Sequence, residues 1–301
     1  MKKTNIIFFL FFFLLRNNVS YCQPLHQLDS IITKELKQAG DSILKGSNDS
    51  VRINYHDKFY SIIDSLLKDS LSFTLSFDSV KTLAVLQSQD KKLRIYNWIL
   101  PLQHGGEFHY FGFVQINDKK TKRVQTFILS EKKWTTDSAE IMKLNNQNWY
   151  GALYYKIVQQ KYNGKVYYTL LGWHGNSFQT TRKIIDVVSF NNNKIQFGTP
   201  IFKAGGKTKT RIVFEYNSQA TMSLKYEESD NRIVFDHLSP SDPRPEAKNM
   251  YSLYGPDMSY DALKFDKGFW IMQKNIQPRN EREHQQKEVP VEKKFRITKF
   301  K

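Results

Sequence analysis

The pattern of apolar positions divides the chain near residue 71. Between residues 23 and 70, apolar side chains recur at steps of three and four, which places them on one face of a helix. The pattern stops at Gly46-Ser47-Asn48-Asp49 and then resumes, so the sequence predicts two amphipathic helices joined by a turn. The apolar positions are Leu28, Ile31, Ile32, Leu36, Ile43 and Leu44, and then Phe59, Ile62, Ile63, Leu66 and Leu67. These apolar faces need a partner, which the rest of the chain must supply.

From residue 71 to residue 272 the period is two, as in half-buried strands. Phe73, Leu75 and Phe77 begin the alternation, and KLRIYNWIL, HYFGFVQI, KVYYTLLGW and RIVFDHL are among the segments that continue it. Turn-forming Asn, Asp and Gly residues separate these segments, and residues 140–144 are expected to add a short helix. The sequence therefore predicts a mainly β, α+β protein with an N-terminal helical segment and an antiparallel β-meander. A sandwich, an open barrel and a propeller-like array all fit this pattern.

The first 22 residues have the layout of a secretory signal peptide. Lys2 and Lys3 supply the positive start, residues 6–15 form an apolar run, and Ser20-Tyr21-Cys22 has small residues at the two positions that signal peptidase reads. An apolar run of this length rises about 15 Å as a helix, half of the ~30 Å hydrocarbon core, so it is too short for a membrane anchor. We therefore expect export to the periplasm or the cell exterior, and no transmembrane segment in the mature chain.

Cys22 is the only cysteine in the chain. Cleavage after Cys22 leaves a mature protein without a thiol, which excludes disulfides, cysteine nucleophiles and cysteine metal sites. The alternative makes Cys22 the lipid-bearing first residue of a lipoprotein, but Tyr21 stands where such a signal has a small residue. The chain is thus divided into a signal peptide at 1–22, a helical segment at 23–70, an antiparallel β domain at 71–272 and a basic tail at 273–301 that is flexible or loosely docked.

The formal net charge of the chain is +16. The signal peptide holds three of these positive charges, and the tail holds nine Lys and Arg against four Glu. An exported protein does not meet nucleic acid, so we expect no nucleic-acid partner despite the basic balance. An envelope polymer, an anionic lipid or another protein is the partner that the charge favours. A generally basic, solvated surface explains the same charge without a partner.

Segments between residues 73 and 272 form a characteristic succession: SQDKKLRIYNW, GEFHYFGFVQ, WYGALYYKI, YYTLLGWHGN, RIVFEYNSQATMSLKYEE and YGPDMSYDALKFDKGFW. This succession resembles a group of uncharacterised secreted and periplasmic proteins of Bacteroidota. The resemblance implies export and a β fold. It implies no particular activity and assigns no catalytic residue to this chain.

The sequence contains no nucleophile elbow, no His-Glu-x-x-His zinc motif, no P-loop and no dinucleotide fingerprint. The best acid–base candidates are His174 and the adjacent residues Asp236 and His237. Adjacent residues of a strand point to opposite faces, so Asp236 and His237 cannot form a hydrogen-bonded dyad with each other. His174 would meet Asp236 only in a fold that joins their two hairpins.

The stretch YYTLLGWHGNSF places His174 at a predicted hairpin tip. Gly175 and Asn176 would supply the positive φ angles of the turn, Trp173 would pack inward and His174 would face solvent. On this interpretation the imidazole titrates near its ordinary pKa of about 6.5, and its loss costs little stability. Replacement of the inward Trp173 by Ala would then cost about 3–5 kcal/mol. Trp173 and Asn176 are also candidates for ligand binding.

No metal or cofactor site is expected from the sequence. No two of the seven histidines have the i, i+4 spacing of a zinc-binding helix, and His104 and His109 flank a Gly-Gly turn without a third ligand. Asp257, Asp261 and Asp266 lack the spacing of a calcium-binding loop, and turn formation explains them. Asp257 and Asp261 are kept as candidates for ligand binding.

Two functions from different classes fit the sequence. The favoured one is a non-enzymatic binding or envelope-associated module, and the alternative is a hydrolase-like enzyme with an unrecognised site near His174, Asp236 and His237. The tryptophans could form a glycan-stacking surface, which would fit the first function. They could equally be parts of a sheet core, with no role in function. They are Trp98, Trp134, Trp149, Trp173 and Trp270. Assembly of the three acid–base residues in one cleft would favour the enzyme, and their separation would favour the binding module.

Overall fold

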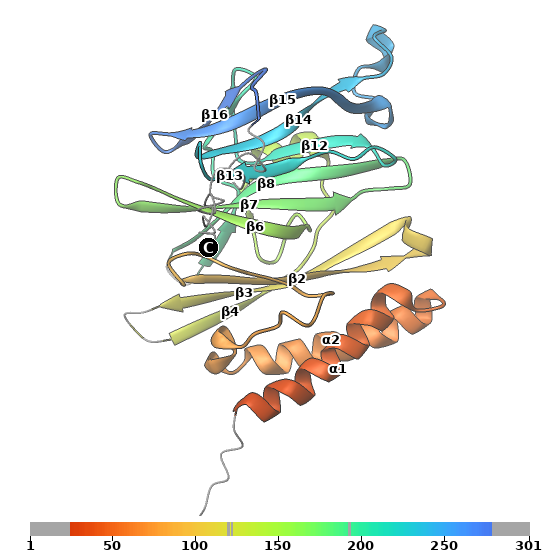
Figure 1. Ribbon diagram of the computed structural model, residues 1–301, viewed down its shortest axis with the longest axis vertical. Coiled ribbons are helices and arrows are strands. Elements are labelled where there is room, and N and C mark those ends of the chain that lie inside the picture. Colours follow the sequence, from red (N-terminus) through yellow and green to blue (C-terminus); the bar gives the residue numbers. More distant parts are fainter. Residues whose placement is uncertain (1–24, 119–120, 122, 192–193, 279–301) are drawn as a thin grey trace, which may run out of the picture.

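Figure 1 shows two helices at one end of the protein and three β-sheets stacked beyond them along its long axis. The computed structural model describes residues 25–118, 121, 123–191 and 194–278. The mainly β fold with N-terminal helices that the sequence predicts is confirmed. The predicted signal peptide and nearly all of the predicted tail, including its alternating KFRITKF stretch, lie outside the described residues.

The two predicted helices are present as α1 (Leu25–Lys45) and α2 (Asp49–Leu67). Asn48 begins the second helix, because its side-chain oxygen accepts a hydrogen bond from the backbone N–H of Val51 at 3.0 Å. Both helices lie against the outer face of the first sheet, which is the partner that their apolar faces require. No helix among the described residues has the length and apolar character to cross a membrane.

The prediction of a strand that begins near residue 71 is wrong. A 3-10 helix, η1 (Ser70–Thr74), and a loop occupy this segment, and the first strand begins at Ala84. The guanidinium of Arg94 holds the segment in place by donating hydrogen bonds to the backbone carbonyls of Phe73 and Leu75, both at 2.6 Å. Phe73 and Phe77 are buried without a β-ladder, so period two in the sequence alone misassigned the segment.

The strands form three sheets, whose strand orders are as follows. The first sheet runs β1 (Ala84–Gln87), β2 (Leu93–Leu102), β3 (Glu107–Asp118), β4 (Arg123–Leu129). The second runs β5 (Leu144–Asn145), β9 (Lys194–Phe197), β8 (Thr180–Asn191), β7 (Lys165–Gly175), β6 (Leu153–Tyr162), with β12 (Ile212–Asn217) also beside β8. The third runs β11 (Lys207–Lys209), β10 (Phe202–Ala204), β16 (Phe269–Gln273), β15 (Tyr254–Asp266), β14 (Arg232–Pro240), β13 (Leu224–Glu227).

Short helices fill the connections between these strands. They are α3 (Thr136–Ile141), η2 (Gln103–Gly105), η3 (Pro245–Ala247) and η4 (Tyr251–Leu253). The short helix predicted at 140–144 thus begins four residues earlier. Neighbouring strands pair in antiparallel fashion, except that β10 pairs with β16 in parallel. The meander pattern did not predict this exception, because the two strands are distant in sequence and no local turn records their pairing.

Helices and sheets form four layers with three hydrophobic cores between them. One core lies between the helices and the first sheet, one between the first and second sheets, and one between the second and third sheets. Strand β2 shows the alternation clearly, because Ile95 faces the second sheet while Tyr96 and Trp98 face the helices. The second sheet is covered on both faces, so its strands have little contact with solvent along their central parts.

The chain stays bound to the third sheet for a few residues beyond residue 272, near which the sequence predicts the end of the folded part. The backbone N–H of Ile276 donates to the carbonyl of Tyr260 at 2.8 Å, and the N–H of Asn275 donates to the Asp261 carboxylate at 3.0 Å. Arg232 also donates to the carbonyl of Gln277 at 3.0 Å. The first residues of the predicted tail are therefore bound along β14 and β15.

Candidate functional site

The candidate site is a pocket of about 270 Å³ at one end of the first and second sheets. Its walls come from the β2–β3 connection, from the segment that follows β4, and from the β7–β8 hairpin. The residues that line it are Gln103, Gly106, Glu107, Phe108, Glu131, Lys133, Trp134, His174, Gly175, Asn176 and Arg182. Donors, acceptors, both signs of charge and two aromatic rings thus converge on a space large enough for one small polar ligand.

His174 lies inside strand β7, and not at the tip of a hairpin. It pairs with Arg182 of β8, and its ring stacks on Tyr110 of the first sheet with 4.6 Å between ring centroids. The ring forms part of the pocket wall, and its Nδ1 atom is buried without a hydrogen-bond partner. The prediction of a solvated turn histidine is therefore wrong. The turn begins one residue beyond Gly175, whose N–H donates to the Tyr110 hydroxyl at 2.6 Å.

Burial and, to a smaller extent, the nearby positive charge of Arg182 lower the pKa of His174 to about 3. The imidazole is consequently neutral across the physiological pH range. A neutral imidazole offers one nitrogen as a donor and the other as an acceptor. His174 can therefore hydrogen-bond an uncharged ligand group, but its low pKa makes it a weak proton acceptor for acid–base catalysis.

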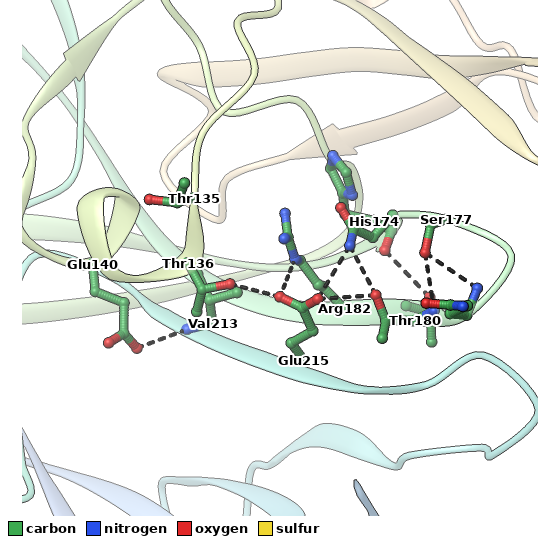
Figure 2. A network of polar contacts seen from close by, with 12 residues as sticks. Thr135, Thr136, Glu140, His174, Ser177, Thr180, Arg182, Val213 and Glu215 are labelled. Carbon is green, nitrogen blue, oxygen red and sulfur yellow. Dashed lines mark hydrogen bonds and ion pairs between the residues drawn. The ribbon is translucent and has the colours of Figure 1, made fainter. Parts of the chain in front are cut away.

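Arg182 is held in the pocket wall by Glu215 of strand β12 (Figure 2). The Glu215 carboxylate accepts hydrogen bonds from Arg182 Nε at 2.8 Å and from the Thr136 hydroxyl at 2.7 Å. Its other oxygen accepts from the Thr180 hydroxyl at 2.9 Å and from the Asn176 side-chain amide at 3.1 Å. Two pocket residues are thus fixed by one carboxylate that does not itself line the pocket.

Glu131 provides a half-buried carboxyl group in the pocket lining. One of its oxygens accepts a hydrogen bond from the backbone N–H of Tyr110 at 2.9 Å. Burial raises the pKa of Glu131, although this hydrogen bond and the nearby His109 and Lys133 oppose the rise. Gly151 makes room for the side chain, because a Cβ at that position would lie 2.8 Å from Glu131 Cγ. No motif in the sequence marks Glu131 as a candidate residue.

The remaining pocket walls are aromatic and polar. Trp134 has a buried indole nitrogen without a hydrogen-bond partner, as His174 Nδ1 does. Phe108 packs edge-on against Trp173, with 5.2 Å between ring centroids. Glu107 accepts a hydrogen bond from the Gln103 side chain at 3.1 Å. No neighbouring side chain satisfies either nitrogen, and both residues line the pocket.

The structure does not bring His174 together with Asp236 and His237. Asp236 accepts a hydrogen bond from the backbone N–H of Ser223 at 2.7 Å, and His237 Nδ1 bonds the Asp261 carboxylate at 2.8 Å. Both residues belong to the third sheet, where β14 and β15 shift register. Among the described residues, no hydrogen bond or ion pair joins either of them to His174. No hydrogen bond among the described residues joins Asp236 to its neighbour His237 either.

The other sequence candidates have structural partners. Asp257 accepts hydrogen bonds from the backbone N–H and hydroxyl of Ser259. The Asp261 carboxylate is hydrogen-bonded to His237 Nδ1 and accepts a second bond from the backbone N–H of Asn275. Asp266 lies at the end of β15, opposite Phe269. No group of three or more His, Cys, Asp or Glu side chains among the described residues is arranged to hold a metal ion.

The five tryptophans do not form one surface. Trp98, Trp149 and Trp270 are fully buried, each in a different core, and they make no stacking platform. Trp134 lines the pocket, and the half-buried Trp173 lies behind Phe108. The glycan-stacking hypothesis is therefore restricted to Trp134 and its neighbours.

No known protein family, curated protein or solved structure matches this chain. The chemistry of the pocket therefore rests on its own residues.

We expect NMR titration to show that the His174 ring stays neutral down to about pH 4. The burial and the Arg182 charge that lower its pKa are both properties of the folded state. The imidazole carbon resonances of His174 are measured as a function of pH and compared with those of the half-exposed His237. A midpoint near 6.5 for His174 would show that the ring is solvated and would contradict the buried site.

The lowered pKa of His174 makes the stability of the folded protein depend on pH. The unfolded chain protonates His174 near 6.5 while the folded chain does not, so stability falls as the pH falls from 6.5 toward 3. Between pH 7 and pH 5 the native protein should lose about 2 kcal/mol more than the His174→Gln variant, measured by urea unfolding. His56, whose pKa burial also lowers, acts equally in both proteins. Equal losses in the two proteins would contradict the assignment.

Proposed function

We propose that the protein is a non-enzymatic, exported binding protein whose pocket takes an uncharged, hydroxyl-rich group, such as a sugar unit of an envelope polymer. The observation that carries this proposal is a pocket lined by both His174 and Trp134, whose Nδ1 and Nε1 atoms have no hydrogen-bond partner in the protein. Native proteins rarely leave such atoms unsatisfied, and a hydroxyl group can both donate to one and accept from another.

The charges of the pocket favour an uncharged ligand. Glu107 and Glu131 are balanced by Lys133 and Arg182, so the lining has no excess of either sign. Arg182 is already paired with Glu215. The faces of Trp134 and Phe108 supply apolar surface of the kind that packs on sugar C–H groups. The pocket volume of about 270 Å³ fits one sugar unit, not a long segment of polymer.

Calorimetric titration with oligosaccharides of N-acetylglucosamine, glucose, mannose and galactose tests this function. At least one should bind saturably, and Trp134→Ala should weaken that binding at least tenfold. Tyr260→Ala, in the third sheet, is the matched aromatic control and should leave the affinity unchanged. Failure of all four oligosaccharides to bind, or equal weakening by both variants, would contradict the proposal.

A glycoside hydrolase is the second candidate, because Glu131 and Glu107 face the same pocket and burial raises the pKa of Glu131. A protonated Glu131 would donate to the leaving oxygen, and Glu107 would serve as the second carboxylate. His174, Asp236 and His237 take no part in this reaction. Release of reducing ends from the bound oligosaccharide, lost in Glu131→Gln and retained in Glu228→Gln, would favour the enzyme over the binding protein.

Export is proposed from the predicted signal peptide, with lipid attachment at Cys22 as the alternative. Cleavage after Cys22 should give a mature protein that begins at Gln23. Intact-mass spectrometry of the protein from the cell envelope and from the medium measures the first residue directly. A diacylated species beginning at Cys22 would identify a lipoprotein instead.

A further inference from the structure

A second cleft, of about 470 Å³, lies at the other end of the second sheet. Strand β7 begins at this cleft with Lys165 and ends at the first pocket with His174, nine residues or about 30 Å away. The cleft forms where the β6–β7 and β15–β16 turns meet the segment before β10. Lys143 lines it from the segment before β5, and Lys267 lines it from the β15–β16 turn. The two sites are therefore separate.

The lining of this cleft carries only positive charge. Lys143, Lys165 and Lys267 line it, and no carboxylate does. Within the described residues, no ion pair joins any of these three lysines to an acidic side chain. Lys203 adds a fourth ammonium group beside the cleft, since its Nζ lies 4.0 Å from the centroid of the Phe269 ring. Unpaired like charges around one concavity attract an anion, whose binding relieves their mutual repulsion.

Packing between the second and third sheets brings the turn that carries Lys267 against the hairpin that carries Lys165. Gly268 follows Lys267 with φ 84°, and a Cβ on Gly268 would lie 3.0 Å from the Tyr162 ring and 3.3 Å from the Tyr167 hydroxyl. The β15–β16 turn is thus seated directly on the β6–β7 hairpin. Lys165 lies over the Tyr167 ring, with its Nζ 5.0 Å from the ring centroid. Lys165 of the second sheet and Lys267 of the third sheet therefore line the same cleft.

We propose that this cleft binds a phosphate group, carried either by a soluble phosphorylated compound or by a phospholipid at a membrane surface. A phosphate group has negative charge on several oxygens, which three ammonium groups can contact from different directions. The aromatic rings of Tyr162, Tyr167 and Phe269 would pack against the part of the ligand that bears the phosphate. This site is independent of the function proposed for the first pocket.

The test compares two triple variants that change the net charge equally. Lys143→Gln, Lys165→Gln and Lys267→Gln remove the charge of the cleft. Lys37→Gln, Lys58→Gln and Lys225→Gln remove three exposed lysines elsewhere. Binding of pyrophosphate is measured by calorimetry in 50 mM salt, and binding to vesicles of phosphatidylglycerol with phosphatidylcholine is measured by co-sedimentation.

The native protein should bind at least one of the two probes, and the cleft variant should bind it at least tenfold more weakly. The control variant should keep the affinity within twofold. Cleft-dependent binding of pyrophosphate alone identifies a soluble phosphorylated ligand, and cleft-dependent binding of vesicles identifies a lipid headgroup. Equal weakening in both variants, or binding of neither probe by the native protein, would overturn the proposal. Unchanged melting temperatures confirm that both variants are folded.

Discussion

Replacing Arg211 by Met is expected to lower the free energy of unfolding by about 3–5 kcal/mol. Arg211 and Asp186 are both completely buried, and Arg211 Nε lies 3.0 Å from an Asp186 oxygen. The guanidinium also donates to the backbone carbonyls of Ala139 and Met142. Removal of the cation leaves the Asp186 carboxylate buried without its countercharge. Urea unfolding followed by circular dichroism at pH 7 measures the change.

A double variant separates the ion pair from simple packing. Asp186→Leu together with Arg211→Met removes both charges, so it should recover much of the stability lost in Arg211→Met. Lys156→Met, which breaks the partly exposed pair of Lys156 with Glu228, should cost less than about 1 kcal/mol. A loss below 1 kcal/mol in Arg211→Met would show that Asp186 is solvated or protonated, in contradiction to the buried pair.

Trp270→Ala should cost about 3–5 kcal/mol, because it removes a large, fully buried side chain from the core between the second and third sheets. The indole N–H of Trp270 donates to the Thr169 hydroxyl of β7 at 3.0 Å, and its ring packs edge-on against Phe265. The substitution thus leaves a cavity and an unpaired buried hydroxyl. The loss is measured by urea unfolding and by the melting temperature.

Trp173→Ala is the matched control for Trp270→Ala. Trp173 is half-buried at the end of β7, so its loss should cost clearly less than the loss of Trp270. The sequence alternation along β7 instead predicts that Trp173 is an inward core residue, whose loss would cost as much as the loss of a fully buried tryptophan. Equal costs for the two substitutions would contradict the burial described for them.

The surroundings of strand β7 explain why the burial of its side chains was predicted wrongly from the sequence. The prediction treated YTLLGWHG as a strand with one buried and one solvated face. The second sheet is covered on both faces, so Thr169, Leu170 and Leu171 are all buried in succession. His174, directed toward the first sheet, is consequently enclosed by Tyr110. Sequence alternation cannot reveal such double coverage, because it depends on how the sheets stack.

The helices were easier to predict than the pocket. Periodicity and the turn at residues 46–49 are local signals, and they predicted two helices separated close to the observed break between α1 and α2. Glu131, Trp134 and Arg182 come from separate segments that only sheet stacking brings together. No spacing in the sequence records that arrangement. Gly151, which follows an aromatic pair, is one local sign of a close approach.

The most direct test of the binding pocket is an NMR titration that follows the indole N–H groups and the His174 ring together. Addition of the oligosaccharide that binds most tightly should shift the resonances of Trp134 and His174 saturably, with one dissociation constant. The indole resonances of Trp149 and Trp270 should not move, since both groups are buried and hydrogen-bonded inside the cores. The account is contradicted if no oligosaccharide shifts Trp134 and His174, or if all of these resonances shift alike.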